Sequence, residues 1–213
     1  MSLLRCHISI SLDGFVAGPK PSQENPLGLG GERLHEWMFS LAAWRRLHGL
    51  EGGEVNESSR IVEEERENIG AGVMGREMFG PSGGGPWGDG QWKGWWGEDP
   101  PFHYPVFVLT HHPREPVEMK GGTTFNFVTD GVEVALQKAR TSSGGKDVML
   151  WGGGQIVNEF LASGLVNILE LHVVPVLLGD GVRLFENVGD VKLEQVRVVE
   201  APGVTHLKYR VVT

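Results

Sequence analysis

Strand-like and helix-like segments alternate regularly between residues 106 and 178, and this alternation is the feature that most constrains the fold. Short apolar runs bounded by turn residues are typical of buried strands. The predicted strands of this region are Val106–Thr110, Phe125–Thr129, Val148–Trp151 and Ile168–Leu178. Between them lie two amphipathic helices, one that Asp130 can cap and one at Gln155–Ser163. Strands joined through helices favour a mostly parallel sheet covered by helices.

The flanking segments extend this pattern. The expected strands are Leu4–Ile10, Ala71–Met74 and a C-terminal pair at Val191–Val199 and Thr205–Val212, and the expected helices are Glu32–Leu47 and a solvent-covered one at Ser58–Asn68. Strong alternation makes the C-terminal pair an antiparallel hairpin. The fold class predicted is α/β, a three-layer sandwich around a mixed, mostly parallel sheet, with residues 1–213 as one domain.

An inserted loop at about 80–105 interrupts the pattern. It carries Trp87, Trp92, Trp95 and Trp96 among many glycines and prolines, without periodicity. Disordered linkers are poor in aromatic residues, so we expect this loop to be ordered. Two interpretations stay open: a surface loop pinned by its tryptophans, or a lid or interface.

The net charge limits the kinds of partner that we expect, and the cysteine content limits the expected cellular compartment. The net charge of −8 argues against nucleic acid, because phosphate backbones are bound by clustered Lys and Arg. Cys6 is the only cysteine, which fits the reducing cytoplasm. We expect no signal peptide and no membrane span, since no apolar run is long enough. A small molecule is the expected partner.

Gly152-Gly153-Gly154 stands between a predicted strand and a predicted helix. A helix start exposes unpaired N–H groups at the positive end of the helix dipole. Glycines remove the Cβ atoms there, so a pyrophosphate can approach the backbone closely. A tight turn is the other explanation of such a triplet, and its position before a helix favours phosphate binding.

Other phosphate and metal motifs are missing. Gly144-Gly145-Lys146 is followed by Asp147 rather than a Ser or Thr, so it is no P-loop. No G-x-G-x-x-G opens a helix early in the chain, which argues against a Rossmann domain. His35-Glu36 and His111-His112 lack the spacing of zinc ligands, so we expect no metal site.

Five motifs occur together in chain order. They are Ser11-Leu12-Asp13-Gly14-Phe15-Val16-Ala17, Val73-Met74-Gly75-Arg76-Glu77-Met78-Phe79, Val108-Leu109-Thr110 with His111-His112-Pro113-Arg114, Gly152-Gly153-Gly154, and Val174-Pro175-Val176-Leu177-Leu178-Gly179. The set resembles the reductase domain of the bifunctional riboflavin-biosynthesis deaminase–reductase and, more broadly, the dihydrofolate-reductase-like superfamily. The resemblance spans nearly the whole chain, and no zinc deaminase motif accompanies it.

The resemblance implies an NADPH-dependent reductase, with hydride going to a small heterocycle such as a pterin or pyrimidine. The implied cofactor-binding residues are Val16, Ala17, Gly75, Arg76, Thr110, His111, Arg114, Gly152, Gly153, Gly154, Gln155 and Ile156. Among them, Arg76 and Arg114 are candidates for the phosphates, although a surface ion pair or a solvated turn would explain either arginine as well. A homodimer is also implied by the resemblance; the apolar segment Ile168–Leu178 and the aromatic loop give it some support.

The implied substrate-binding residues are Asp13, Gly14, Phe15, Trp37 and Phe79. Asp13 is a candidate to orient the substrate or supply a proton, and an Asx-turn is its structural alternative. Glu36 is the other candidate catalytic residue, with His35 beside it; ordered water is a third proton source. Trp37 and Phe79 suit the walls of a flat ring site, and both suit the core equally well.

Two positions depart from the family pattern. Met78 stands where many relatives carry a Thr hydroxyl, and Asn167-Ile168 replaces a frequent acidic pair. These departures and the Trp-rich loop suggest a substrate other than that of the riboflavin pathway. A non-catalytic nucleotide- or pterin-binding protein on the same scaffold is the alternative function, and an interaction module built on the loop is a third.

Overall fold

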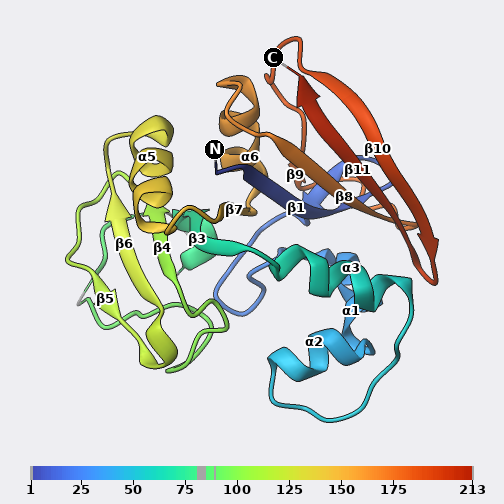
Figure 1. The fold of residues 1–213 in the computed structure, drawn as a ribbon, viewed down its shortest axis with the longest axis horizontal. Helices are drawn as coiled ribbons and strands as arrows, with labels where there is room; N and C mark the ends of the chain where they lie inside the picture. Colours follow the sequence, from blue (N-terminus) through green and yellow to red (C-terminus); the bar gives the residue numbers. More distant parts are fainter. Residues whose placement is uncertain (1, 81–84, 89, 213) are drawn as a thin grey trace.

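The computed structural model describes residues 2–80, 85–88 and 90–212, and its centre is a nine-stranded sheet (Figure 1). The strand order is β10-β11-β8-β1-β7-β3-β4-β6-β5. The strands are β1 (Leu4–Ser11), β3 (Ile69–Gly75), β4 (Pro105–Leu109), β5 (Val117–Glu118), β6 (Thr124–Val128), β7 (Asp147–Trp151), β8 (Ile168–Val174), β10 (Lys192–Ala201) and β11 (Val204–Val212). A small second sheet pairs β2 (Phe15–Ala17) with β9 (Val182–Arg183).

The six strands from β8 to β6 run parallel to one another. β11 is antiparallel to β8, and β10 and β11 form the antiparallel hairpin at one edge. The predicted mixed, mostly parallel sheet with a C-terminal hairpin is therefore confirmed. Because carboxyl ends of parallel strands meet at one edge, the segments that follow β1, β3, β4 and β7 are neighbours in space.

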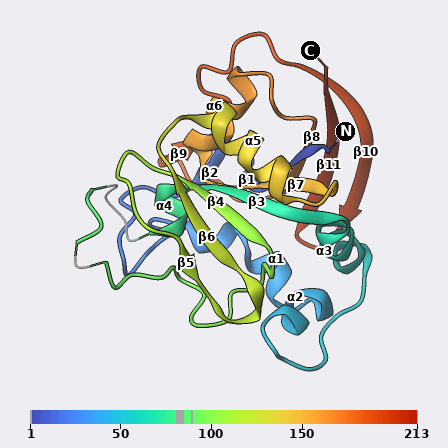
Figure 2. The same ribbon diagram turned by 60° about the vertical axis from the view of Figure 1, so that its left-hand side comes forward.

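Helices cover both faces of this sheet (Figure 2). The helical segments are η1 (Gly31–Leu34), α1 (Glu36–Phe39), α2 (Ala42–Leu47), α3 (Glu57–Arg66), α4 (Arg76–Phe79), η2 (Lys120–Gly122), α5 (Val132–Ser142) and α6 (Gly154–Ala162). Helices α5 and α6 lie on one face, and the η1–α3 region lies on the other, so the three-layer arrangement is as expected.

Three local predictions were wrong. The expected helix over 32–47 is broken, because Leu41 is extended and the backbone on either side of it pairs with Glu54. Asp130 does not cap α5; its carboxylate lies 3.7 Å from the Lys138 Nζ, and Gly131 is the N-cap. The strand expected to reach Leu178 ends at Val174, because Pro175 lacks the N–H that a sheet ladder requires.

The two faces of β1 differ in polarity and both are buried. Cys6, Ile8 and Ile10 join the apolar core beneath α6. On the other face, His7 and Ser9 are also buried, at 8% and 4% exposure. Helix α3 covers this polar face, since its Glu65 lies 3.0 Å from His7. The expectation of a solvent-covered helix is therefore wrong for one side of α3.

The described part of the Trp-rich loop is pinned by its aromatic side chains. Trp87 donates from Nε1 to the His112 carbonyl at 2.7 Å, and Trp92 donates to the Phe79 carbonyl at 2.8 Å. Trp96 stacks on Phe125 of β6. These contacts favour the pinned surface loop over the lid. Residues 81–84 and 89 of the loop lie outside the described residues.

Strand β8 is paired on both sides, with β1 and with β11. Both of its edges are therefore used within the chain, and Leu169, Leu171 and Val174 are buried, whereas Leu177 beyond the strand is exposed. Within the described residues, none of the helices has the length and apolar character needed to cross a bilayer.

Cys6 gives a direct check on the core. Its side chain is 0% exposed, and burial raises the pKa of its thiol to about 12. Since the thiolate is the reactive form, we expect no reaction with a chromogenic disulfide reagent at mildly alkaline pH. Unfolding in guanidinium should release one reactive thiol per chain. Rapid labelling of the native protein would contradict this packing.

Candidate functional site

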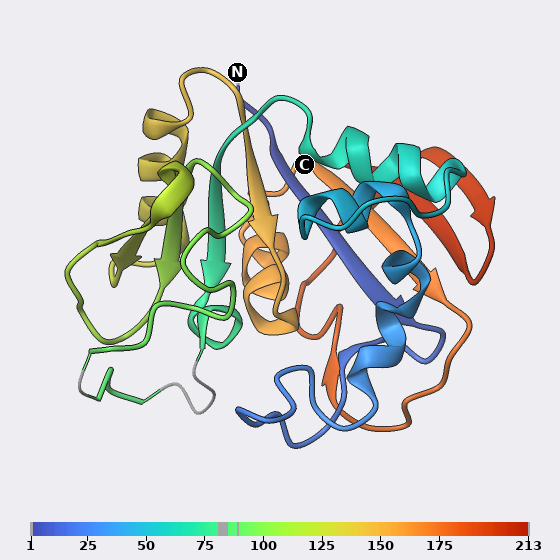
Figure 3. The ribbon, with the colours of Figure 1, turned by 90° about the horizontal axis from the view of Figure 1, so that it is seen from below.

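The candidate site lies where the carboxyl ends of β1, β7, β3 and β4 come together (Figure 3). Met74 of β3 pairs with Trp151 of β7 and with Val108 of β4, so these strands end at nearly the same level. The motifs that follow them are thereby gathered into one region: Gly75-Arg76 after β3, Thr110-His111 after β4, and Gly152-Gly153-Gly154 after β7.

The three glycines of the triplet differ in how strictly the structure requires them. At Gly153 the backbone φ is +97°, which side-chain-bearing residues rarely adopt. At Gly154 a Cβ would lie 2.8 Å from both Val16 Cγ2 and Val182 Cγ1, so β2 and β9 pack directly on the helix start. At Gly152 a Cβ would meet only Ile8, at 3.4 Å.

The N-terminus of α6 is suited to an anion. Its N-cap is Gly153, which is exposed and has no side chain to cover the first N–H groups. The first residues of the helix, Gly154, Gln155 and Ile156, are uncharged. The unpaired N–H groups of a first turn and the helix dipole together attract phosphate. Gly152 and Gly153 are thus half-buried and exposed, whereas Gly154 is buried beneath β2 and β9.

Other predicted cofactor-binding residues lie near the N-terminus of α6. Val16 of β2 lies against Gly154, and a Cβ on Gly75 would lie 3.5 Å from Ile156. Val16, Gly75 and Gly152–Ile156 are therefore brought together as expected. Ala17 continues β2 beside them and is half-buried.

Asp13 acts as an anchor for the loop after β8. Its carboxylate accepts hydrogen bonds from the Gly179 N–H at 2.7 Å, from the Leu178 N–H and from the Ser11 hydroxyl at 2.6 Å. The Ser11 hydrogen bond and these N–H groups lower the pKa of Asp13 to about 2. The carboxylate is therefore ionised at neutral pH, which rules against Asp13 as a proton donor and favours its structural role.

The other proton-donor candidates differ in exposure. Glu36 begins α1 and is exposed. His35 precedes it, and burial lowers the pKa of His35 to about 4. At neutral pH the imidazole of His35 therefore carries no extra proton to give. Of the candidates named from the sequence, Glu36 and water are left.

Arg76 and Arg114 both contact Trp87 of the inserted loop. The Arg76 guanidinium lies 3.8 Å from the centre of a Trp87 ring and donates to the Gly80 carbonyl. Arg114 lies 4.9 Å from the ring and donates to the Gly90 and Trp92 carbonyls. Burial lowers the pKa of both guanidinium groups. Sequence reasoning missed this arrangement, since nothing in the spacing links Trp87 to the two arginines.

The segment after β4 is a closed turn. Thr110 is buried, and its hydroxyl accepts the His112 N–H at 3.1 Å. His111, between them, is exposed. Of this pair, His111 is the side chain free to contact a ligand, whereas the Thr110 hydroxyl closes the turn.

The predicted aromatic walls are core residues instead. Phe79 is 0% exposed and packs edge-on against Trp87, Phe125 and Phe127. Trp37 belongs to a separate apolar cluster and donates to the Leu34 carbonyl at 3.1 Å. The two rings therefore cannot enclose one flat ligand, and the core explanation of both is correct.

Phe15 is also covered. Its ring is buried, with the Arg183 guanidinium 4.3 Å from the ring centre. Gly14 beside it is half-exposed, with φ at +88°. Backbone groups around Gly14 and Ala17, rather than the Phe15 ring, are left to face a ligand.

The two departures from the family pattern lie in different places. Asn167 is at the start of β8, where its side-chain oxygen accepts the Leu4 N–H at 2.8 Å. This is the edge of the sheet opposite the candidate site, so its lack of charge does not affect the site directly. Met78 packs on the aromatic cluster around Phe79.

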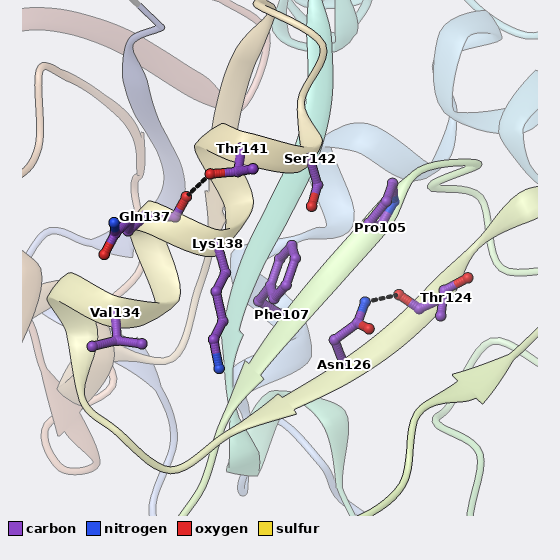
Figure 4. Close-up of a pocket in the computed structure, with 9 residues that line it drawn as sticks. All are labelled: Pro105, Phe107, Thr124, Asn126, Val134, Gln137, Lys138, Thr141 and Ser142. Atoms are coloured by element: carbon purple, nitrogen blue, oxygen red, sulfur yellow. Dashed lines mark hydrogen bonds between the residues drawn. The ribbon is translucent and has the colours of Figure 1, made fainter.

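A separate open hollow of about 600 Å³ lies between α5 and strands β4 and β6 (Figure 4). It is lined by Phe107, Asn126, Val134, Lys138 and Thr141, among others. None of its lining residues belongs to the candidate site. The hollow is therefore not the expected cofactor position.

The packing at Gly154 predicts a large difference between two alanine variants. Gly154→Ala forces a Cβ against Val16 and Val182, so we expect the free energy of unfolding to fall by about 1–3 kcal/mol. Gly152→Ala meets only ordinary contact and should change it by less than about 1 kcal/mol. Urea unfolding followed by circular dichroism measures both. Equal effects would mean that β2 does not pack on the helix start.

Comparison with solved structures finds the same fold in three proteins. A Shewanella sp. PV-4 protein named for riboflavin biosynthesis aligns over all of both chains, with 18% identity and a TM-score of 0.61. The deaminase/reductase of Thermotoga maritima aligns over 99% of this chain and 57% of its own, with 14% identity and a TM-score of 0.58. Dihydrofolate reductase from Enterococcus faecalis, complexed with NADP(H), aligns over 98% and 96%, with 14% identity and a TM-score of 0.52.

Sequence comparison gives a more specific result. The uncharacterized protein YyaP of Bacillus subtilis is 30% identical over 95 residues, which is 43% of this chain and only half of that protein's length. The profile of the RibD C-terminal domain matches residues 3–207. The chain therefore belongs to the RibD C-terminal domain family.

Proposed function

We propose that this chain is an NADPH-dependent oxidoreductase that transfers hydride to a small heterocycle, such as a pterin or pyrimidine. One observation carries the proposal: the uncapped N-terminus of α6 opens beside the carboxyl ends of β3 and β7. Membership of the RibD C-terminal domain family and the fold shared with dihydrofolate reductase support it.

The residues fit a dinucleotide phosphate. Glycine at 153 and 154 lets the backbone turn sharply and β2 approach, which leaves N–H groups rather than side chains at the helix start. The pyrophosphate would be held by Gly152–Ile156, with Gly75 beside it. Arg76, Thr110, His111 and Arg114 would border the ribose and its 2′-phosphate. Val16 and Ala17 would border the nicotinamide end.

Arg76 and Arg114 bear on the preference for NADPH. Two guanidinium groups near one position favour a phosphate, and NADPH differs from NADH by its 2′-phosphate. In this structure both groups contact Trp87, so direct contact with the 2′-phosphate would require that ring to shift.

NADPH, when bound, supplies the hydride, so the chain's task is to position it and to exclude water. Asp13 contributes by fixing the loop after β8 to the turn before β2. Gly14 and Ala17 offer backbone groups to the substrate. The proton then comes from Glu36 or from water, because Asp13 is ionised and His35 is neutral at neutral pH.

A charge placed at the helix start tests the cofactor site. Gly152→Asp sets a carboxylate beside the proposed pyrophosphate, while an acid near a helix N-terminus does not destabilise the helix. We expect NADPH affinity to fall at least about tenfold, measured by quenching of tryptophan fluorescence. Gly152→Asn is the matched control, since it has the same shape without the charge. Equal affinity of the two variants, or no saturable binding by the unaltered protein, would overturn the site.

A non-catalytic nucleotide- or pterin-binding protein is the second candidate. The burial of Phe79 and Trp37 and the anchoring role of Asp13 favour it, because they leave few side chains to act on a substrate. Loss of NADPH absorbance with folates, pterins, pyrimidines and small carbonyls should occur with at least one class if the chain is an enzyme. Saturable NADPH binding without turnover across the panel would favour the binding protein. The cytoplasmic location and the homodimer stay part of the proposal.

A further inference from the structure

A buried group of histidines and glutamates lies on the face of the sheet opposite α6. His7 and Glu170 are paired neighbours on β1 and β8, and His172 and His206 are paired neighbours on β8 and β11. Paired residues of adjacent strands point to the same face, so these side chains collect under α3. The group is separate from the proposed NADPH site, which uses the carboxyl edge of the sheet.

Three ligand-type atoms converge within this group. Glu65 Oε1, from α3, lies 3.0 Å from His7 Nδ1 and 2.9 Å from His172 Nε2. All three atoms lie within 4.8 Å of one another. His7 and His172 are 8% and 3% exposed. Two imidazoles and a carboxylate from three different elements are thus directed to one buried position.

The contacts are close but are not aligned as hydrogen bonds. Among the described residues, neither ring nitrogen of His7 has a hydrogen-bond partner, and the same holds for Glu65 Oε1. The three atoms therefore converge on one position, with Glu65 Oε1 in contact with both imidazoles. Ligand bonds of about 2.0–2.2 Å at tetrahedral angles put neighbouring ligand atoms about 3.3–3.6 Å apart, so the contacts of Glu65 would lengthen by a few tenths of an ångström around an ion.

His172 is oriented by groups behind it. Its Nδ1 lies 2.7 Å from His206 Nδ1, and His206 Nε2 lies 2.9 Å from the Ser58 hydroxyl. If His172 donates from Nδ1 and His206 donates from Nε2 to Ser58, both imidazole protons are used and His172 Nε2 keeps a free lone pair. Metal-binding histidines are held in this way, through the ring nitrogen that does not bind the ion.

Glu170 lies next to the group, but its carboxylate forms ion pairs with the cations around it. Its Oε2 is 3.7 Å from His7 Nδ1 and 3.1 Å from Lys208 Nζ, and its Oε1 is 3.0 Å from Arg197. Lys208 and Arg197 are thereby paired, so they do not place an unbalanced positive charge beside the three ligand atoms.

We propose that His7 Nδ1, Glu65 Oε1 and His172 Nε2 bind one divalent first-row transition-metal ion, of which zinc is the representative. Two imidazoles and one carboxylate form a ligand set that such ions prefer. The ion joins β1, β8 and α3 across the buried polar face. Its role is structural, since the site lies apart from the carboxyl edge where the cofactor is proposed.

Metal titration of the whole chain tests this site. Protein stripped with a chelator is titrated with Co²⁺, followed by its visible d–d absorption, and with Zn²⁺ in competition. We expect one ion per chain and a rise in melting temperature of about 5 °C at saturating Zn²⁺. An absence of binding of either ion by the folded, unaltered protein would overturn the proposal and would assign the group as a metal-free ion-pair network.

Variants then locate the ion. His172→Gln and Glu65→Gln should each weaken Co²⁺ binding at least about 100-fold, and Ser58→Ala, behind the ligands, about tenfold. His48→Gln removes an exposed histidine and is the matched control, with affinity unchanged. Glu65→Gln keeps the shape of the side chain, so its Co²⁺ affinity tests the site even if the histidine variant does not fold. Undiminished affinity in Glu65→Gln would show that the ion binds elsewhere.

Discussion

Strand β1 runs through the middle of the sheet, parallel to β7 on one side and to β8 on the other. Its odd and even positions face two different buried layers. Ile8 on one face packs beneath Gly152 and helps to set the start of α6. On the other face, His7 meets Glu65 and Ser9 accepts a hydrogen bond from Trp37. The proposed phosphate site at the start of α6 and the polar group are therefore built on the same strand.

Close packing alone accounts for two of the three glycines at the proposed phosphate site. Gly154 has no Cβ because β2 and β9 occupy that space, and Gly153 has none because its φ is positive. Gly152 is the one position of the three where a side chain would meet neither a clash nor a positive φ. A glycine triplet in a sequence does not separate these causes, whereas the contacts of each residue do.

Sequence patterns were sufficient where local periodicity decides structure. The alternation along β1, β3 and the C-terminal hairpin, and the apolar stripe of α6, gave the correct elements and the parallel sheet. They failed where distant contacts decide. The pairing of Leu41 with Glu54 breaks a helix that periodicity favours. Phe79 and Trp37 were candidates for ligand walls because composition cannot distinguish a core ring from a site ring.

The same limit explains why the histidine group escaped notice. Its members lie at positions 7, 65 and 172, far from any local metal-binding spacing, and only strand pairing brings them together. The signal that was available is the polar half of β1. A strand at the centre of a parallel sheet is buried on both faces. The polar side chains of His7 and Ser9 therefore needed buried polar partners, unless the strand assignment was wrong.

Stability alone does not account for this polar layer. Burying a carboxylate and imidazoles costs several kcal/mol of desolvation, and apolar side chains of the same volume would usually be at least as stable. The cost is offset for Glu170, which has Lys208 and Arg197 as cationic partners. Glu65 has no Lys or Arg partner among the described residues, and its ion-pair contacts are the rings of His7 and His172. A divalent cation at the proposed site would place a fixed positive charge beside Glu65 and bind all three ligand atoms at once.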